Sequence, residues 1–144
     1  FFFFLSKKGG HMSVVALTKT QLNIMQILWD AAEPLTIADI SSILGISTTS
    51  LSNMVNQLIK KGFIEISGVK RTDNHYSRTL KPLRTKEEYA AKMVSSLNMK
   101  KGSFSAVVSA LVDEYSLNDG YEEIISEIEE VLNKYTNKEE ISEK

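Results

Sequence analysis

Apolar residues in the first half of this 144-residue chain recur at the spacing of α-helices. The first stripe comprises Leu22, Met25, Leu28 and Trp29. Ahead of it, Thr18 and Gln21 have the spacing of a capping box, in which each side chain bonds the backbone N–H of the other residue. The pattern predicts a helix over about residues 19–31, with Trp29 closing its buried face.

Two shorter helices are predicted next, joined by a glycine turn. Thr36 and Asp39 form a second capping box, and Gly45 is suited to end that helix in a left-handed conformation. Ser47 caps the following helix, which Gly62 ends. That helix has the apolar stripe Leu51, Met54, Val55, Leu58 and Ile59 and the opposite stripe Thr49, Ser52, Asn53, Asn56 and Lys60. Two helices in this arrangement are typical of a DNA-reading helix-turn-helix.

A two-stranded hairpin is predicted after the third helix. Residues 63–66 and 75–80 have the composition of strands. The polar residues 67–74 between them are expected to form a loop with Lys70 and Arg71 at its tip. Three helices followed by a hairpin indicate a winged helix. The predicted fold class is therefore mainly α with a small β-wing, followed by a C-terminal helical dimerisation region.

Residues after Pro82 carry wide apolar stripes at helical spacing, which predicts three longer helices. Thr85 and Glu88 would start the first of them, and Asn118 the last. The residues expected to pack against a second copy of the chain are Phe104, Val107, Val108, Leu111, Val112, Tyr115, Tyr121, Ile124, Ile125, Ile128, Val131 and Leu132. A closed monomer could also bury these stripes, but their width beside a DNA-reading unit favours a homodimer.

The chain divides into several predicted parts. Residues 1–12 are expected to be a tag or a disordered N-terminus, because Gly-His-Met at 10–12 is typical of a cloning scar. Residues 13–84 form the predicted winged-helix DNA-binding domain, 85–136 the three-helix dimerisation region, and 137–144 a flexible tail. No apolar run reaches the length of a membrane span, so no membrane insertion is expected.

The net charge of −1 hides an asymmetry between the two halves. Residues 1–84 contain ten Lys and Arg against five Asp and Glu, a net charge of +5, whereas residues 85–144 contain seven against thirteen, a net charge of −6. The N-terminal part is therefore the better partner for double-stranded DNA, which is a polyanion. The absence of cysteine excludes disulfides and thiolate metal sites and fits a cytoplasmic location.

The candidate DNA-binding residues lie on the third helix and the hairpin. They are Ser47, Thr48, Thr49, Ser50, Ser52, Asn53, Asn56, Gln57, Lys60, Lys70, Arg71 and Arg78. The short hydrogen-bonding side chains suit base edges, whereas the cations suit phosphates. No catalytic residue, metal or cofactor is expected, because the motifs that would assemble a nucleophile, a base and a stabilising group are missing.

Two segments of the chain resemble the penicillinase-repressor, or BlaI/MecI/CopY, family of bacterial winged-helix repressors. They are residues 22–29, LNIMQILW, and residues 51–62, LSNMVNQLIKKG. The resemblance extends over about residues 17–136. It implies a homodimeric transcriptional repressor on a palindromic operator, with antibiotic-resistance or stress genes as targets and a sensor protease as a partner.

The chain departs from that family at several positions. Thr49, Ser52 and Gln57 stand where the family often has cations, which predicts a different operator sequence. The lack of cysteine argues against copper sensing. The family's sensor protease cleaves an Asn-Phe bond, and this chain contains no such pair, which argues against release by that cleavage.

Two other functions stay open at this point. The Leu17-Thr18-x-x-Gln21 opening resembles MarR-like ligand-responsive regulators. That family usually has an earlier helix and an Asp-Arg pair in the wing, where this chain has Asp73 and Asn74. A winged helix can also bind another protein instead of DNA. Salt-dependent binding to duplex DNA would separate these alternatives, and an enzyme is the least expected class.

Overall fold

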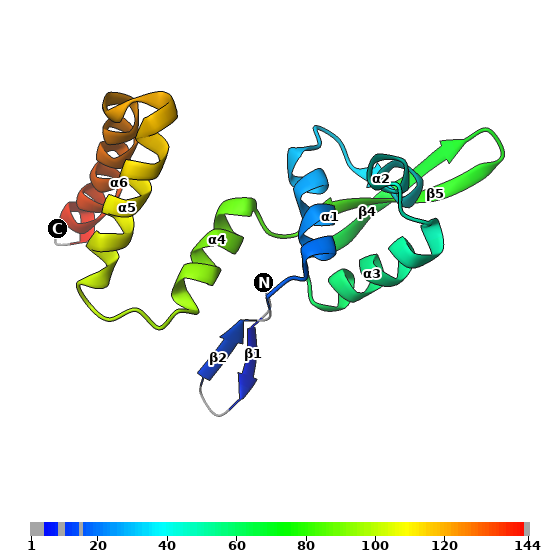
Figure 1. The fold of residues 1–144 in the computed structure, drawn as a ribbon, viewed down its shortest axis with the longest axis horizontal. Coiled ribbons are helices and arrows are strands. Elements are labelled where there is room, and N and C mark those ends of the chain that lie inside the picture. The colour runs from blue at the N-terminus through cyan, green and yellow to red at the C-terminus, as the bar shows by residue number, and fades with distance from the viewer. Residues whose placement is uncertain (1–4, 9–10, 15, 143–144) are drawn as a thin grey trace. The chain divides into compact units, whose positions relative to one another are not determined.

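The computed structural model describes residues 5–8, 11–14 and 16–142. Its internal contacts define two compact units, Phe1–Asn98 and Met99–Lys144. The first unit contains the helices α1 (Lys19–Asp30), α2 (Ile37–Leu44), α3 (Thr48–Lys60) and α4 (Lys86–Ser95) and the strands β3 (Leu35–Thr36), β4 (Ile64–Thr72) and β5 (His75–Pro82). The second unit contains α5 (Ser103–Asp119) and α6 (Tyr121–Ser142) (Figure 1). The chain has the predicted fold class, a mainly helical winged helix-turn-helix with a small antiparallel wing.

The predicted helix starts in the first unit are confirmed. Thr18 Oγ1 accepts a hydrogen bond from Gln21 N at 3.2 Å, and Gln21 Oε1 accepts one from Thr18 N at 3.1 Å. Thr36 and Asp39 form the same reciprocal pair at the start of α2. Gly45 ends α2 with a φ of 68°, a conformation that other residues rarely adopt. These bonds occupy N–H groups that a helix leaves without internal partners, so they stabilise each helix locally.

The wing differs from the prediction in its length and its number of strands. Residues 67–72, expected as loop, belong to β4, and the turn consists only of Asp73 and Asn74. Lys70 and Arg71 therefore lie on a strand and not at the tip. The prediction was wrong because backbone pairing between β4 and β5 continues through a polar segment that lacks apolar alternation. The short strand β3 pairs with β5, which gives the sheet the order β3-β5-β4.

The core of the first unit lies between α1, α2, α3 and the sheet. Its buried side chains are Ile24, Met25, Leu28, Ile40, Leu51, Val55, Leu58, Phe63, Ile64 and Leu80. Helices α1 and α3 supply most of this list. Of the stripe predicted for α1, Met25 and Leu28 are buried, whereas Leu22 and Trp29 are half-buried and the buried Ile24 lies outside the predicted stripe. Burial of one stripe of α3 leaves its polar stripe at the surface.

Helix α4 packs on this core through Tyr89 and Met93. The centre of the Tyr89 ring lies 5.8 Å from the centre of the Trp29 ring and 6.0 Å from that of the Phe63 ring. Burial of Tyr89 raises the pKa of its hydroxyl. Trp29 Nε1 donates to the carbonyl oxygen of Arg84 at 2.7 Å. The first compact unit therefore extends to Asn98, and α4 belongs to it, whereas its stripe had been grouped with the dimerisation helices.

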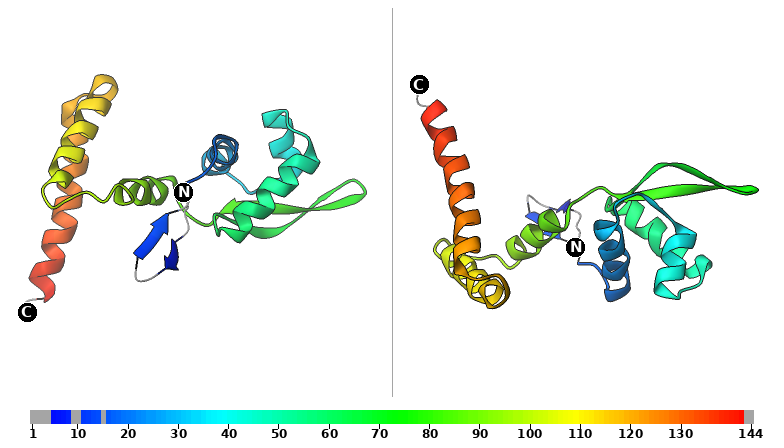
Figure 2. Two further views of the ribbon diagram at one scale, coloured as in Figure 1. Left: turned by 60° about the horizontal axis from the view of Figure 1, so that its bottom comes forward. Right: turned by 90° about the horizontal axis from the view of Figure 1, so that it is seen from above.

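The second unit is a pair of helices, α5 and α6, that lie side by side (Figure 2). Gly120 joins them with a φ of 84°. Helix α5 runs through Asn118, so the expectation that Asn118 starts the next helix was wrong; Gly120, two residues later, makes the turn with a positive φ that glycine adopts readily. Helix α6 continues to Ser142, through most of the segment expected as a flexible tail, and residues 143–144 lie outside the described residues.

The N-terminal segment contains the strands β1 (Leu5–Lys8) and β2 (His11–Val14), which pair in antiparallel fashion. The sequence predicts residues 1–12 as a tag or a disordered N-terminus; residues 5–8 and 11–12 lie on these strands, and the origin of the segment as a tag stays a prediction. Residues 1–4 and 9–10 of that prediction lie outside the described residues. None of the helices in the described part of the chain combines the length and apolar character needed to cross a bilayer.

Candidate nucleic-acid interface

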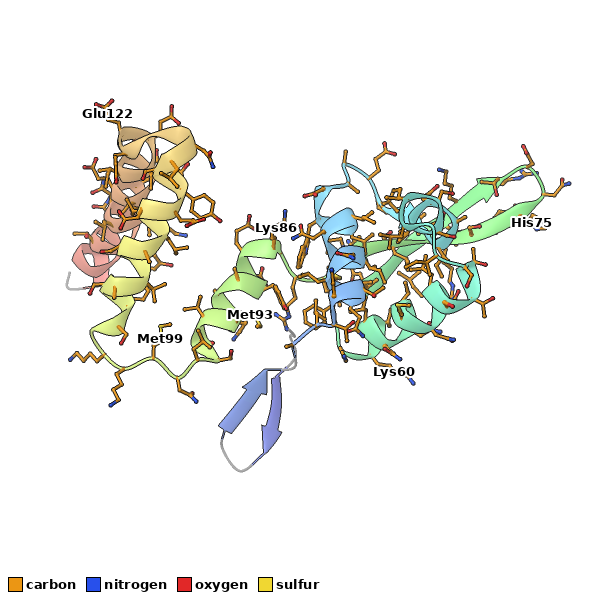
Figure 3. The ribbon with its side chains drawn as sticks, in the orientation of Figure 1. Lys60, His75, Lys86, Met93, Met99 and Glu122 are labelled. Atoms are coloured by element: carbon orange, nitrogen blue, oxygen red, sulfur yellow. The ribbon has the colours of Figure 1, made fainter. Side chains whose placement is uncertain are left out.

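Helix α3 presents the polar stripe that the sequence predicts. Leu51, Val55 and Leu58 are buried on one side of the helix. The predicted DNA-binding residues of this helix and its cap that are exposed are Ser47, Thr48, Thr49, Ser50, Asn53, Asn56, Gln57 and Lys60. Ser52 is half-buried. The arrangement leaves uncharged hydrogen-bonding groups along most of the exposed face and a cation, Lys60, in its last turn (Figure 3).

The two serines at the start of α3 are engaged with each other. Ser47 Oγ accepts a hydrogen bond from Ser50 N at 3.3 Å and donates to Ser50 Oγ at 3.0 Å. Ser47 is therefore the helix cap, as predicted, and its hydroxyl is partly occupied by that role. The N-terminus of the helix still carries a positive dipole end, which favours a phosphate nearby.

A hollow of about 200 Å³ lies between α2, α3 and the sheet. Its polar lining comes from Ser52, Asn56, Ser77 and Arg78, and its walls are apolar. Of the predicted site residues, the structure thus brings Ser52, Asn56 and Arg78 together on the side of α3 that faces the wing.

The three predicted wing cations do not share one face. Val69 is paired with Arg78 and Arg71 with Tyr76, while Lys70 is paired with Ser77. Because successive residues of a strand point to opposite faces, Arg71 and Arg78 lie on the same face and Lys70 lies on the other. The Arg71 guanidinium is 5.9 Å from the centre of the Tyr76 ring. This exposed tyrosine therefore lies on the same face of the wing as Arg71 and Arg78.

Lys70 lies close enough to α2 to interact with Asp39. The pKa of the Asp39 carboxyl is below its ordinary value, mainly because the carboxylate accepts a hydrogen bond from the backbone N–H of Thr36. The Thr36 hydroxyl and the positive charge of Lys70 lower it further. A neighbouring carboxylate reduces the positive potential around Lys70, so Arg71 and Arg78 are the stronger anion-binding groups of the wing.

Ion pairs divide the basic residues near the site into two groups. Lys81 is paired with Glu65 at 2.9 Å, Lys86 with Asp30 at 3.0 Å and Arg84 with Glu88 at 3.8 Å. Over the ranges that the structure describes, no ion pair involves the remaining cations between Ser47 and Lys86, which are Lys60, Lys61, Lys70, Arg71 and Arg78. The positive charge not offset by an ion pair is therefore concentrated at the end of α3 and on the wing.

Gln57 occupies the side of α3 that faces α1. Its Oε1 accepts a hydrogen bond from Nε2 of Gln21 at 3.1 Å. Sequence reasoning missed Gln21 as a residue of the site. Its place in the capping box signals the start of α1, but nothing in the sequence pairs it with a residue 36 positions away.

The predicted dimer-interface residues all lie on α5 and α6. Several are exposed, including Phe104, Leu111, Tyr115 and Leu132, while Val108, Val112, Ile124 and Ile128 are half-buried between the helices. A groove of about 430 Å³ runs between the two helices. In the described part of the chain, no group of His, Cys, Asp or Glu is placed to hold a metal ion.

The sequence model of the MarR family matches residues 17–67, which is less than half of the chain. No curated protein sequence matches the chain. The solved structures similar to it include FabT of Streptococcus pneumoniae in complex with DNA, at 18% identity and a TM-score of 0.41, covering 87% of this chain and 78% of FabT. They also include the zinc-responsive MarR family member ZitR of Lactococcus lactis, at 24% identity and a TM-score of 0.41, covering 92% of this chain and 84% of ZitR. These TM-scores are too low to support a functional argument.

The resemblance to the penicillinase-repressor family is wrong, because the MarR family model matches the region on which it rested. Both resembling segments, 22–29 and 51–62, lie within residues 17–67. They consist largely of residues that pack α1 and α3 into the core, such as Leu28 and Leu58. Packing of that kind is common to winged helices and does not separate one family from another. The sensor protease inferred as a partner loses its support with that resemblance.

Proposed function

We propose that this protein is a MarR-like winged-helix transcriptional regulator that binds double-stranded DNA as a homodimer and represses transcription. The observation that carries the proposal is the surface of the first unit. The exposed side of α3 offers uncharged hydrogen-bonding groups, such as Asn53, and cations without ion pairs lie at its end and on the adjoining wing. Base edges are read by the first kind of group and phosphates are held by the second.

In the proposed complex, α3 lies in the major groove of the DNA. Thr49 and Asn53 face base edges, Lys60 faces a phosphate, and Arg71 and Arg78 of the wing contact the flanking backbone. Between Ser47 and Lys86, a stretch that the structure describes throughout, five cations per subunit have no ion pair: Lys60, Lys61, Lys70, Arg71 and Arg78. If all contact phosphates in a dimer, the logarithm of affinity should fall with the logarithm of salt concentration with a slope approaching about −9.

The homodimer is supported by the apolar residues that α5 and α6 leave exposed, among them Phe104 and Leu132. Two-fold symmetry would present two copies of α3 at a separation of about 34 Å or a multiple of it, so the operator should be a palindrome. Repression would follow from steric exclusion of RNA polymerase. A regulator of chromosomal promoters works beside the chromosome, so we propose a cytoplasmic location.

The test is selection of bound duplexes from a random DNA library at two salt concentrations, with the mass of the protein in solution measured alongside. A palindromic consensus bound by a dimer, with affinity that falls steeply with salt, is the expected result. A folded dimer that enriches no sequence and binds no duplex would contradict the proposal and favour a protein-binding winged helix.

A further inference from the structure

A chain of hydrogen bonds connects the cap of α1 to the exposed face of α3. The backbone N–H of Thr18 donates to Oε1 of Gln21 at 3.1 Å, and Nε2 of Gln21 donates to Oε1 of Gln57 at 3.1 Å. Gln21 is only 3% exposed, whereas Gln57 is exposed. The buried side-chain amide of Gln21 thus links the cap of α1 to Gln57, a candidate DNA-binding residue.

The orientation of both amides follows from the first donor. A backbone N–H can only donate, so the Gln21 amide must turn its oxygen toward Thr18 and its NH2 group toward α3. That buried NH2 group needs an acceptor, which only the oxygen of the Gln57 amide supplies in this pair. The opposite orientation of Gln57 would place two NH2 groups against each other. The NH2 group of Gln57 is therefore left for contacts outside the protein.

We propose that Gln21 is a positioning residue that makes Gln57 a donor-only contact for DNA. The inference rests on the proposed function and specifies the chemistry of one of its contacts. A free glutamine can accept and donate together and so pair with adenine in two hydrogen bonds. Held by Gln21, Gln57 instead meets an acceptor, which is a guanine or thymine oxygen, a purine N7 or a phosphate oxygen.

The variant Gln21→Glu reverses this polarity while it keeps the capping box. One carboxylate oxygen still accepts from Thr18 N, since glutamate is a usual residue at this position of a capping box. The other oxygen faces α3 and accepts, so Gln57 turns its NH2 group inward and presents its oxygen to the DNA. The signals of the Gln57 side-chain amide should then exchange with water more slowly than in the wild type, which nuclear magnetic resonance can measure without any DNA.

Selection from the random DNA library reports the effect on binding. If Gln57 contacts a base, the Gln21→Glu variant should change the preferred base at one position of each half-site. If Gln57 contacts a phosphate, the consensus should stay the same and affinity should fall about 5- to 10-fold. Neutral methylphosphonates placed singly along the selected duplex should then weaken the wild type at one phosphate at which the variant is insensitive.

Two controls isolate the proposed role. Gln26→Glu adds the same charge to α1 without the bond to Gln57 and should leave base preference and affinity unchanged. In a Gln57→Ala background, Gln21→Glu should add no further change. A folded Gln21→Glu protein with wild-type consensus, affinity and methylphosphonate profile would overturn the inference, as would an effect that persists without Gln57.

If Gln21→Glu fails to fold, Gln57→Glu serves instead, because it keeps an acceptor for Gln21 and removes the outward donor. Its affinity should fall at least about 5-fold, and unchanged affinity would overturn the inference. The failure of the proposed function is distinguishable from these results, because it appears as wild-type protein that binds no duplex at all. The amide exchange measurement tests the hydrogen-bond polarity even then.

Discussion

The two units of the molecule contain helices with similar apolar stripes but differ in how completely those stripes are buried. In the first unit, Phe63 is 0% exposed and packs with apolar residues from three helices and a sheet. In the second unit, Phe104 is 75% exposed, and none of the described hydrophobic residues reaches full burial. The apolar stripes are alike in spacing, so the difference comes from the number of surfaces available to cover them.

The comparison shows what an apolar stripe can and cannot establish. A pair of helices can cover only the sides that face each other, and the remaining apolar surface needs a third element or a second molecule. The first unit has β3, β4, β5 and α4 for this purpose. The second unit, taken by itself, has nothing further among the described residues, which is the physical basis for proposing a dimer.

The largest expected effect is a difference in the free energy of unfolding between two matched phenylalanine substitutions, one in each unit. Phe63→Ala should lower the free energy of unfolding of the first unit by about 3–5 kcal/mol, because it leaves a cavity in a closed core. Phe104→Ala should leave that transition unchanged, since Phe104 belongs to the second unit and not to the core of the first. Urea unfolding followed by the fluorescence of Trp29, the single tryptophan of the chain, reports on the first unit. Equal effects of the two substitutions would contradict the comparison.

The next effect concerns association of the second unit. Leu132→Asp would place a carboxylate in the proposed dimer interface and should weaken dimerisation by at least about 2 kcal/mol, or some thirtyfold in Kd. Ile43→Asp is the matched control, because Ile43 and Leu132 are both 60% exposed but lie in different units. Sedimentation over a range of concentrations should show dissociation for Leu132→Asp alone. A protein that is monomeric before any substitution would refute the proposed interface.

The charges of the two units provide a smaller effect. Arg78→Ala should weaken DNA binding about tenfold for all sequences and make the salt slope of the dimer shallower by about 2, because it removes one phosphate contact from each of the two subunits. Lys134→Ala, on α6, should have no effect, and Lys81→Ala should have little, because Lys81 is already paired with Glu65. Fluorescence anisotropy with the selected duplex at several salt concentrations measures all three. An Arg78→Ala protein with unaltered binding would show that the wing lies away from the DNA.

Local chemistry explains which parts of the fold the sequence could predict. Caps such as Thr18 with Gln21 and Thr36 with Asp39 lie within one turn of the helix they start, so their residues are close in the sequence. The buried stripe of α3 follows from the helical spacing of its apolar residues alone. The polar face of α3, with Thr49 and Asn53, was therefore predictable, because it is the remainder of the helix surface.

The parts that could not be predicted depend on contacts between distant residues. β4 continues through polar residues because β5 pairs with it, and the spacing of Tyr89 does not say whether it packs on Phe63 or on a second copy. The bond between Gln21 and Gln57 joins two helices and has no local signature. Arg78 shares a face of the wing with Arg71 and not with Lys70 because of the register of β4 and β5, and a shift of one residue would reverse this.

The smallest effect concerns the cap of α2, within the first unit. The pKa of Asp39 is lowered in the folded state, so its carboxylate stabilises the unit above its unfolded pKa, and that contribution is lost as the pH falls through the folded pKa. Asp39→Asn should therefore cost a few tenths of a kcal/mol near pH 7, and the difference from the wild type should start to shrink below about pH 4 and disappear only below the lower pKa of the folded state. Urea unfolding, followed by the fluorescence of Trp29, measures this difference in the free energy of unfolding between pH 7 and acid, with Asp113→Asn of α5 as the control. A difference that grows in acid would contradict the assignment.

The pairing of β3 with β5 also has a consequence for the order in which the first unit folds. The contact of Leu35 with Leu80 closes a loop that contains α2, α3 and β4. Such closure costs chain entropy before any contact repays it, so it becomes favourable only once the enclosed helices have packed. We therefore expect the two residues of β3, Leu35 and Thr36, to report the last step of folding of the first unit. Their amide hydrogens should become protected from exchange together with the core, and the wing should not persist as a separately folded hairpin.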